Sequence, residues 1–132
     1  MIIEIKNDKT IASICEDFSR YYPFLRLQFY SKPHGWQEAS SYKHLLDNEK
    51  TIKELKPNGH EGLIEIHYWQ KTGNIEREFA ARFGLYVQVM RKQNDKWVQT
   101  LGTDELSLED QNEAGRKASE DFLHGTDRKF NQ

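Results

Sequence analysis

One cysteine, Cys15, is present among the 132 residues, and this scarcity excludes two kinds of small protein. An internal disulfide needs two cysteines, and a structural zinc site usually needs several. A lone thiol is typical of proteins from a reducing compartment. We therefore predict a cytoplasmic protein that has neither a disulfide framework nor a cysteine-rich metal site.

The chain also lacks long apolar runs and an excess of either charge. A membrane-spanning helix needs about 20 consecutive apolar residues. The apolar run at the N-terminus, within residues 1–5, is too short for a signal peptide. The 19 basic and 21 acidic residues give a net charge of −2. Because sites for nucleic acid usually show a basic field, we predict no membrane contact and no strong binding to nucleic acid.

Apolar residues make up 36% of the chain and aromatic residues 12%, which suffices for one hydrophobic core. A domain of this length buries roughly two-thirds of the surface that its unfolded chain exposes. No repeat, low-complexity segment or shift in composition marks a boundary inside the chain. We predict a single domain over residues 1–132, in which residues 124–132 form a flexible tail.

Alternation of apolar and polar residues predicts five β-strands, because successive side chains of a strand point to opposite faces. The strands cover approximately residues 2–6, 24–31, 62–70, 85–92 and 96–101. Apolar residues at helical spacing predict helices over residues 10–21, less regularly over 41–55, around 75–83 and over 107–123. The order β-α-β-α-β-α-β-β-α predicts an α+β fold with a single mixed or mostly antiparallel sheet of about five strands and three to four helices.

Residues at the ends of the predicted helices fit helix boundaries. Asp8 or Thr10 can cap the N-terminus of the first helix. Gly84 follows the third helix, where a C-cap glycine belongs. Ser107 stands three residues before Asp110, which resembles a capping box at the start of the last helix.

The segment GLIEIHYWQ, residues 62–70, has two faces of different character. Ile64, Ile66 and Tyr68 point to one face and are expected in the core. The other face mixes rings with charged and hydrogen-bonding groups, which suits neither a dry interior nor plain solvent. Dividing the other strands in the same way gives a mixed face that holds Arg26, Gln28, Tyr30, Glu65, His67, Trp69, Tyr86, Gln88, Met90, Trp97 and Gln99.

Such a mixture is typical of binding surfaces, because large rings give contact area and their polar tips need partners. The loop 32–40, with His34 and Trp36, adjoins this face. The candidate partner-binding or ligand-binding residues are Arg26, Tyr30, Trp36, Glu65, His67, Trp69, Tyr86, Gln88 and Trp97. Three interpretations stay open: ordinary packing of a half-covered sheet face, association with a protein or a second copy, and a site for a small molecule or nucleic acid.

Candidate catalytic and metal-binding groups are few. Cys15 lies on the apolar stripe of the first helix, where a thiol is inert. The histidines between residues 34 and 67 lack the close spacing of metal ligands. Glu65 and His67 share a face, but no third partner for acid–base chemistry is evident. Glycine-rich phosphate loops and a nucleophile elbow are absent, so we predict no catalytic residue, no metal and no cofactor.

The stretch FGLYVQVMRKQNDKWVQTLGTDELSLEDQN, residues 83–112, resembles part of a group of small uncharacterised bacterial α+β proteins. In these proteins a hairpin with one Trp leads through a Thr-Asp turn into a final helix. The resemblance implies the same hairpin and helix here, and it implies no activity and no site residue.

These patterns favour a non-enzymatic binding protein that uses the mixed face to associate with a protein partner, or with itself as a homodimer. The alternative is a small-ligand-binding protein or an enzyme, with a pocket around His67, Glu65 and Arg26.

Overall fold

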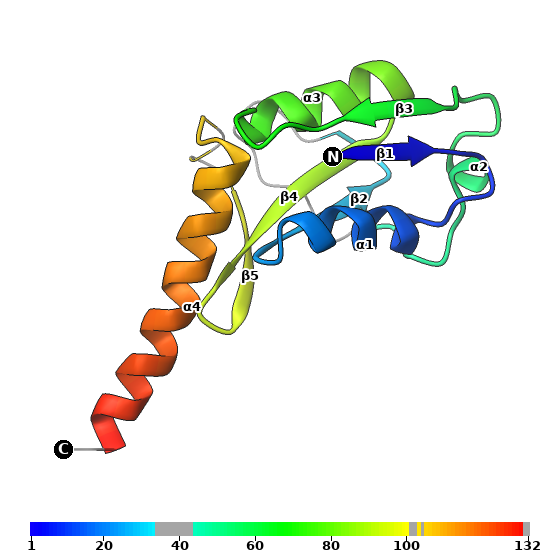
Figure 1. Ribbon diagram of the computed structural model, residues 1–132. Coiled ribbons are helices and arrows are strands. Elements are labelled where there is room, and N and C mark those ends of the chain that lie inside the picture. The colour runs from blue at the N-terminus through cyan, green and yellow to red at the C-terminus, as the bar shows by residue number, and fades with distance from the viewer. Residues whose placement is uncertain (34–43, 101–102, 104, 131–132) are drawn as a thin grey trace.

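A computed structural model of the protein describes residues 1–33, 44–100, 103 and 105–130, with side chains up to residue 120. The predicted order of strands and helices and the α+β class are confirmed (Figure 1). The elements are β1 (Ile2–Ile5), α1 (Ile11–Tyr21), β2 (Leu25–Tyr30), α2 (Ile52–Leu55), β3 (Gly62–Glu65), α3 (Thr72–Phe83), β4 (Tyr86–Gln93), β5 (Lys96–Gln99) and α4 (Leu108–Phe130).

The described strands form two antiparallel sheets rather than the single sheet expected from the sequence. β1 pairs with β3, and β4 lies between β2 and β5. Residues from both sheets share one hydrophobic core, among them Ile3, Ile64, Leu27 and Val89. Alternation shows which face of a strand is buried, but it does not show which strands exchange hydrogen bonds, and this is why the division was missed.

The helices enclose this core from several sides. In Figure 1 the β1–β3 pair lies between α1 and α3 and in front of the larger sheet. α1 contacts β2 and β1, α3 contacts β4, and α4 contacts mainly β4. The C-terminal half of α4 runs out beyond the β4–β5 hairpin.

α1 and α3 form as the sequence predicts. Thr10 caps α1, because its side-chain oxygen accepts a hydrogen bond from the Ser13 backbone N–H. Gly84 ends α3 with a φ of 63°, a left-handed conformation that glycine adopts without steric cost. The phase of both helices is set by apolar residues that are buried in the common core: Ile11, Ile14, Phe18, Ile75, Phe79 and Phe83.

The irregular helix expected over residues 41–55 is reduced to α2, whose start is fixed by a capping box between Thr51 and Glu54. Asp47 accepts a hydrogen bond from the Glu49 backbone N–H, and this local turn competes with helix formation. Leu45 instead forms an extended bridge to Tyr30 of β2. Residues 41–43 of the expected helix lie outside the described part of the chain.

The last helix starts where expected and ends later. Ser107 accepts a hydrogen bond from the Asp110 backbone N–H, as a helix cap does. α4 then continues to Phe130, beyond the predicted end near Leu123 and into the segment expected to be a tail. A single glycine such as Gly125 weakens a helix without ending it, and no proline follows.

Candidate functional site

The predicted mixed face is present on the larger sheet with the predicted phase. Residues paired across antiparallel strands share a face, and the register pairs Arg26 with Met90 and Tyr30 with Tyr86. Met90 in turn pairs with Gln99, which places Gln99 on this face together with Trp97. Five of the nine candidate residues therefore lie together on β2, β4 and β5: Arg26, Tyr30, Tyr86, Gln88 and Trp97.

The centre of this face is packed and not open. Tyr30, Gln88 and Met90 are at most 3% exposed. The Tyr30 hydroxyl donates a hydrogen bond to Gln28 at 2.8 Å, and the Gln88 amide donates one to Glu76 of α3 at 3.0 Å. Because these polar tips have partners inside the chain, the centre of the face supports the packing interpretation.

Cationic side chains cover the rings at the margins of the mixed face. The Arg26 guanidinium lies 4.7 Å from the ring centroid of Trp97, and the Lys56 ammonium lies 5.7 Å from that of Tyr86. Both distances are within the range of a cation–π interaction. Arg26, Tyr86 and Trp97 are only half-buried, so solvent and ligands can still reach the margins.

Glu65, His67 and Trp69 lie apart from that face, beside the smaller sheet. β3 ends at Glu65, and a turn follows in which the His67 backbone N–H donates to the Gln70 side chain at 2.7 Å. Trp69 is 62% exposed and stacks on His67, with ring centroids 5.1 Å apart and an interplanar angle of 8°. The turn also exposes Tyr68, which is 60% exposed, so its predicted place in the core was wrong.

The alternative pocket around His67, Glu65 and Arg26 is not formed by the described residues. His67 and Glu65 line a hollow on the outer side of the β1–β3 pair. Arg26 lines another hollow, beside α1 and β2. Trp36, the remaining candidate, and His34 lie outside the described residues.

Two exposed aliphatic residues complete the surface around His67. Ile2 is 59% exposed and Leu63 is 52% exposed, and both lie on the outer face of the β1–β3 pair. With Glu65 and His67 they line an open hollow of about 520 Å³, and Glu78 and Arg82 of α3 form its other side. Ile2 was missed as a site residue, although its alternation with the buried Ile3 already indicated an outward side chain.

The chemistry available at this surface is contact and hydrogen bonding. The His67 Nε2 and Glu65 Oε2 atoms are 3.7 Å apart; Glu65 is exposed and His67 is half-buried. In the described part of the chain, no three His, Cys, Asp or Glu side chains come together as metal ligands. Burial raises the pKa of Cys15 to about 12, and its thiol donates to the Leu27 carbonyl. These groups are not arranged as a nucleophile with its base.

Comparisons with known proteins add no relative. No protein-family model, curated protein or solved structure matches the chain. The resemblance of residues 83–112 to small bacterial α+β proteins stays a prediction. None of the described helices combines the length and apolar character that crossing a membrane requires. The function is therefore argued from the geometry alone.

Proposed function

We propose that this protein is a non-enzymatic association protein that pairs with a second copy of itself through the outer side of the β1–β3 pair. We call this surface the outer patch and define it by Ile2, Leu63, Glu65, His67 and Trp69. The observation that carries the proposal is the Trp69 ring, 62% exposed and stacked on His67, which itself borders the exposed Ile2 and Leu63. Apolar surface of this kind often marks an interaction site.

The aromatic stack gives the outer patch a rigid anchor. Trp and Tyr are enriched at the centres of protein interfaces, because they bury large areas and lose little side-chain entropy on binding. The Trp69 ring is already held in one orientation by His67, so less freedom is lost when a partner covers it. The hollow beside His67 offers the partner's own projecting ring a place to dock.

Charge around the outer patch favours a second copy over a strongly charged partner. Glu4 pairs with Lys6 at 3.0 Å, and Glu78 pairs with Arg82 at 3.0 Å. Both signs therefore flank the apolar centre, and Glu65 within the patch lies beside the His67 imidazole, 3.7 Å from its Nε2 atom. In a two-fold dimer the same patch meets itself, so a surface of one sign would repel its copy, whereas this mixture does not.

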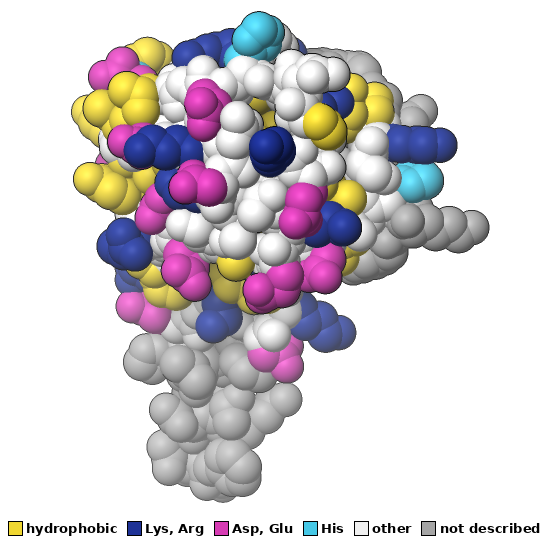
Figure 2. Space-filling model, turned by 90° about the vertical axis from the view of Figure 1, so that its right-hand side faces the viewer, with side chains coloured by type: hydrophobic (Ala, Val, Ile, Leu, Met, Phe, Trp, Pro, Cys, Tyr) yellow, Lys and Arg dark blue, Asp and Glu magenta, His cyan; other side chains and the backbone are white. Residues whose placement is uncertain are grey.

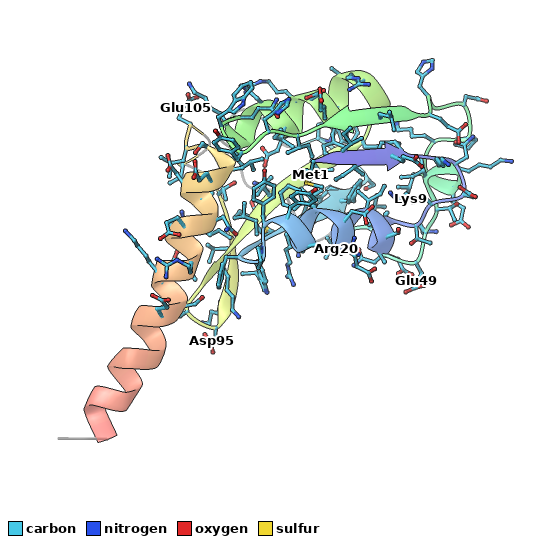
Figure 3. The ribbon with its side chains drawn as sticks, viewed as in Figure 1. Met1, Lys9, Arg20, Glu49, Asp95 and Glu105 are labelled. Atoms are coloured by element: carbon cyan, nitrogen blue, oxygen red, sulfur yellow. The ribbon has the colours of Figure 1, made fainter. Side chains whose placement is uncertain are left out.

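Figure 2 shows a surface with the same character. Hydrophobic side chains gather along its left edge, which corresponds to the front of the molecule in Figure 1, where β1 and β3 lie. Lysine, arginine, aspartate and glutamate side chains are interleaved with them. In Figure 3 Met1 lies at the start of β1, in the middle of this side of the molecule.

The proposal is tested by measuring the mass in solution, by light scattering or sedimentation, over a range of concentrations. The wild-type chain should give a dimer. Trp69→Glu and Leu63→Glu each place a charge in the outer patch and should give monomers with an unchanged circular dichroism spectrum. Tyr21→Glu is the matched control, because Tyr21 is 63% exposed but lies on α1, outside the patch.

A wild-type chain that is monomeric at every concentration would contradict the proposal. So would a dimer that survives both patch substitutions, or one that Tyr21→Glu disrupts equally.

A further inference from the structure

A second hollow, of about 530 Å³, lies between α1, β2 and residues 45–48. Its size falls within the roughly 300–1,000 Å³ of small-molecule sites. Figure 3 labels Arg20 on α1 and Glu49 just after residue 48, and both lie along the lower side of the molecule in that view. The polar residues of its lining that matter here are Cys15, Glu16, Ser19, Arg26, Gln28 and Asp47.

Arg26 is the cationic group among the described residues of this lining. Its Nε atom is buried and has no hydrogen-bond partner. None of the described residues forms an ion pair with its guanidinium, whose central carbon lies over the Trp97 ring, 4.7 Å from the ring centroid. A charged group that is partly buried without partners lowers stability, so its presence calls for another explanation.

Two of the neutral groups beside Arg26, on α1, are already engaged elsewhere. The Cys15 thiol donates a hydrogen bond to the Leu27 carbonyl at 3.2 Å, and the Ser19 hydroxyl donates one to the Leu25 carbonyl at 3.0 Å. Both side chains thereby cover the outer edge of β2. The terminal nitrogens of Arg26 are then the charged donors that a molecule in the hollow would meet, beside the amides of Gln28 and Asn48.

Two carboxylates border the same hollow from other elements. Glu16 is exposed on α1, and Asp47 is exposed in the segment opposite. Neither forms an ion pair with another described residue, and Asp47 uses Oδ1 to accept a hydrogen bond from the Glu49 backbone. The hollow therefore presents one cation and two exposed carboxylates on separate elements. A ligand with a single charge would be attracted by one group and repelled by the other.

We infer that this hollow binds a small zwitterion of the amino-acid class, with its carboxylate on Arg26 and its ammonium group toward Glu16 and Asp47. The guanidinium is planar, rests against an indole ring and can receive a carboxylate through two parallel hydrogen bonds. The site is separate from the outer patch, and its occupation does not depend on association.

The inference is tested by NMR titration of the full chain with glycine, L-alanine, L-leucine and L-glutamine, and with acetate and methylammonium as singly charged probes. At least one amino acid should shift the Arg26 Nε–H and Trp97 indole resonances saturably. Arg26→Gln should weaken that binding about 10- to 100-fold, as expected for hydrogen bonds between charged groups. Glu16→Gln should weaken amino-acid binding and leave the response to acetate unchanged.

Arg20→Gln is the matched control, because Arg20 is an exposed arginine of α1 outside the lining. It should bind as the wild type does. Each variant's amide spectrum reports whether it is folded, and if Arg26→Gln is not, the exposed Glu16 substitution decides. The inference is overturned if none of the four amino acids binds, if acetate binds as tightly as the best amino acid, or if the folded lining variants bind like the wild type.

Discussion

The Glu76 carboxylate of α3 accepts a hydrogen bond from the backbone N–H of Val89 in β4, at 2.9 Å. β5 ends at Gln99, opposite Met90, so β4 has no strand partner on this side at Val89. The carboxylate takes the place of the missing strand, while Thr100 donates to the Val89 carbonyl. A side chain of a helix thus completes the hydrogen bonding of a sheet edge.

We expect Glu76→Ala to lower the free energy of unfolding by about 2–4 kcal/mol, because it leaves the buried Val89 N–H without its acceptor and removes one acceptor of the Gln88 amide. Urea denaturation measures the loss. Glu78→Ala on the same helix removes a partly exposed ion pair with Arg82, and it should cost less than about 1 kcal/mol. Equal losses for the two variants would mean that the hydrogen bonds of Glu76 contribute no more to stability than the partly exposed ion pair of Glu78.

Gly115 lets α4 approach the rest of the molecule closely. A Cβ at this position would lie 2.8 Å from the Phe24 Cβ and 3.2 Å from the Lys92 carbonyl oxygen. Asn112, one turn earlier, accepts a hydrogen bond from the Phe24 backbone N–H at 2.9 Å. The glycine in the middle of the helix is therefore explained by contact with the strands, although it weakens the helix itself.

We expect Gly115→Ala to lower the free energy of unfolding by about 1–3 kcal/mol, despite the higher helix propensity of alanine, because the contact must open. Chemical denaturation followed by tryptophan fluorescence checks this result. Lys117→Ala, at an exposed position of the same helix, should change the stability by less than about 0.5 kcal/mol. A stabilised Gly115→Ala would show that α4 does not pack here.

The sequence was sufficient to predict features that depend on neighbouring residues. The cap at Thr10, the stop at Gly84 and the faces of β2, β4 and β5 are as expected, because each follows from local dihedral preferences or alternation. The strand expected to run through Trp69 stops at Glu65, since Gln70 folds back to bond His67. A side chain that closes a turn leaves no mark in an alternating pattern.

The structure places the candidate residues on two separate surfaces, and the sequence did not indicate this for a related reason. Strand alternation places residues on faces but gives no information on which strands are paired, so Glu65 and Arg26 were assigned to one surface. The pairing of β1 with β3 separates them. The acceptor role of Glu76 likewise depends on where β5 ends relative to α3, which only the folded arrangement determines.

The Cys15 thiol should react slowly in the folded protein. Burial raises its pKa to about 12 from the ordinary 9.0, so at pH 8 the thiolate fraction falls about a thousandfold. We expect alkylation by iodoacetamide to be slower by that order in the native chain than in urea. Native and unfolded chains that react at similar rates would contradict the burial of the thiol.

The raised pKa of Cys15 also predicts that the protein loses stability at alkaline pH. The folded state keeps the Cys15 proton up to a pH near 12, whereas the unfolded state gives it up above pH 9.0. The stabilisation is therefore complete below pH 9 and is lost as the pH rises from 9 towards 12. Urea denaturation at several pH values should show a steeper decline for the wild type than for Cys15→Ala, whose remaining decline comes from other groups.

Arg26 and Arg91 are half-buried arginines on adjacent strands and on opposite faces of the sheet, and their hydrogen bonding differs. Arg91 donates a hydrogen bond to the fully buried Gln111 at 2.9 Å, whereas the Arg26 Nε is buried without a partner. A side chain retained for folding should contribute to stability. A side chain retained to bind a ligand can leave the stability of the ligand-free protein unchanged, or can lower it.

We expect Arg91→Met to lower the free energy of unfolding by about 1–3 kcal/mol, because Gln111 loses its donor. Arg26→Met should change it by less than about 1 kcal/mol, since the lost cation–π contact is offset by removing a poorly solvated charge. Urea denaturation of both variants without added amino acids gives the comparison. If Arg26→Met proved the more damaging substitution, Arg26 would have to be assigned to the framework of the fold, and its buried, unpartnered Nε atom would no longer point to a ligand.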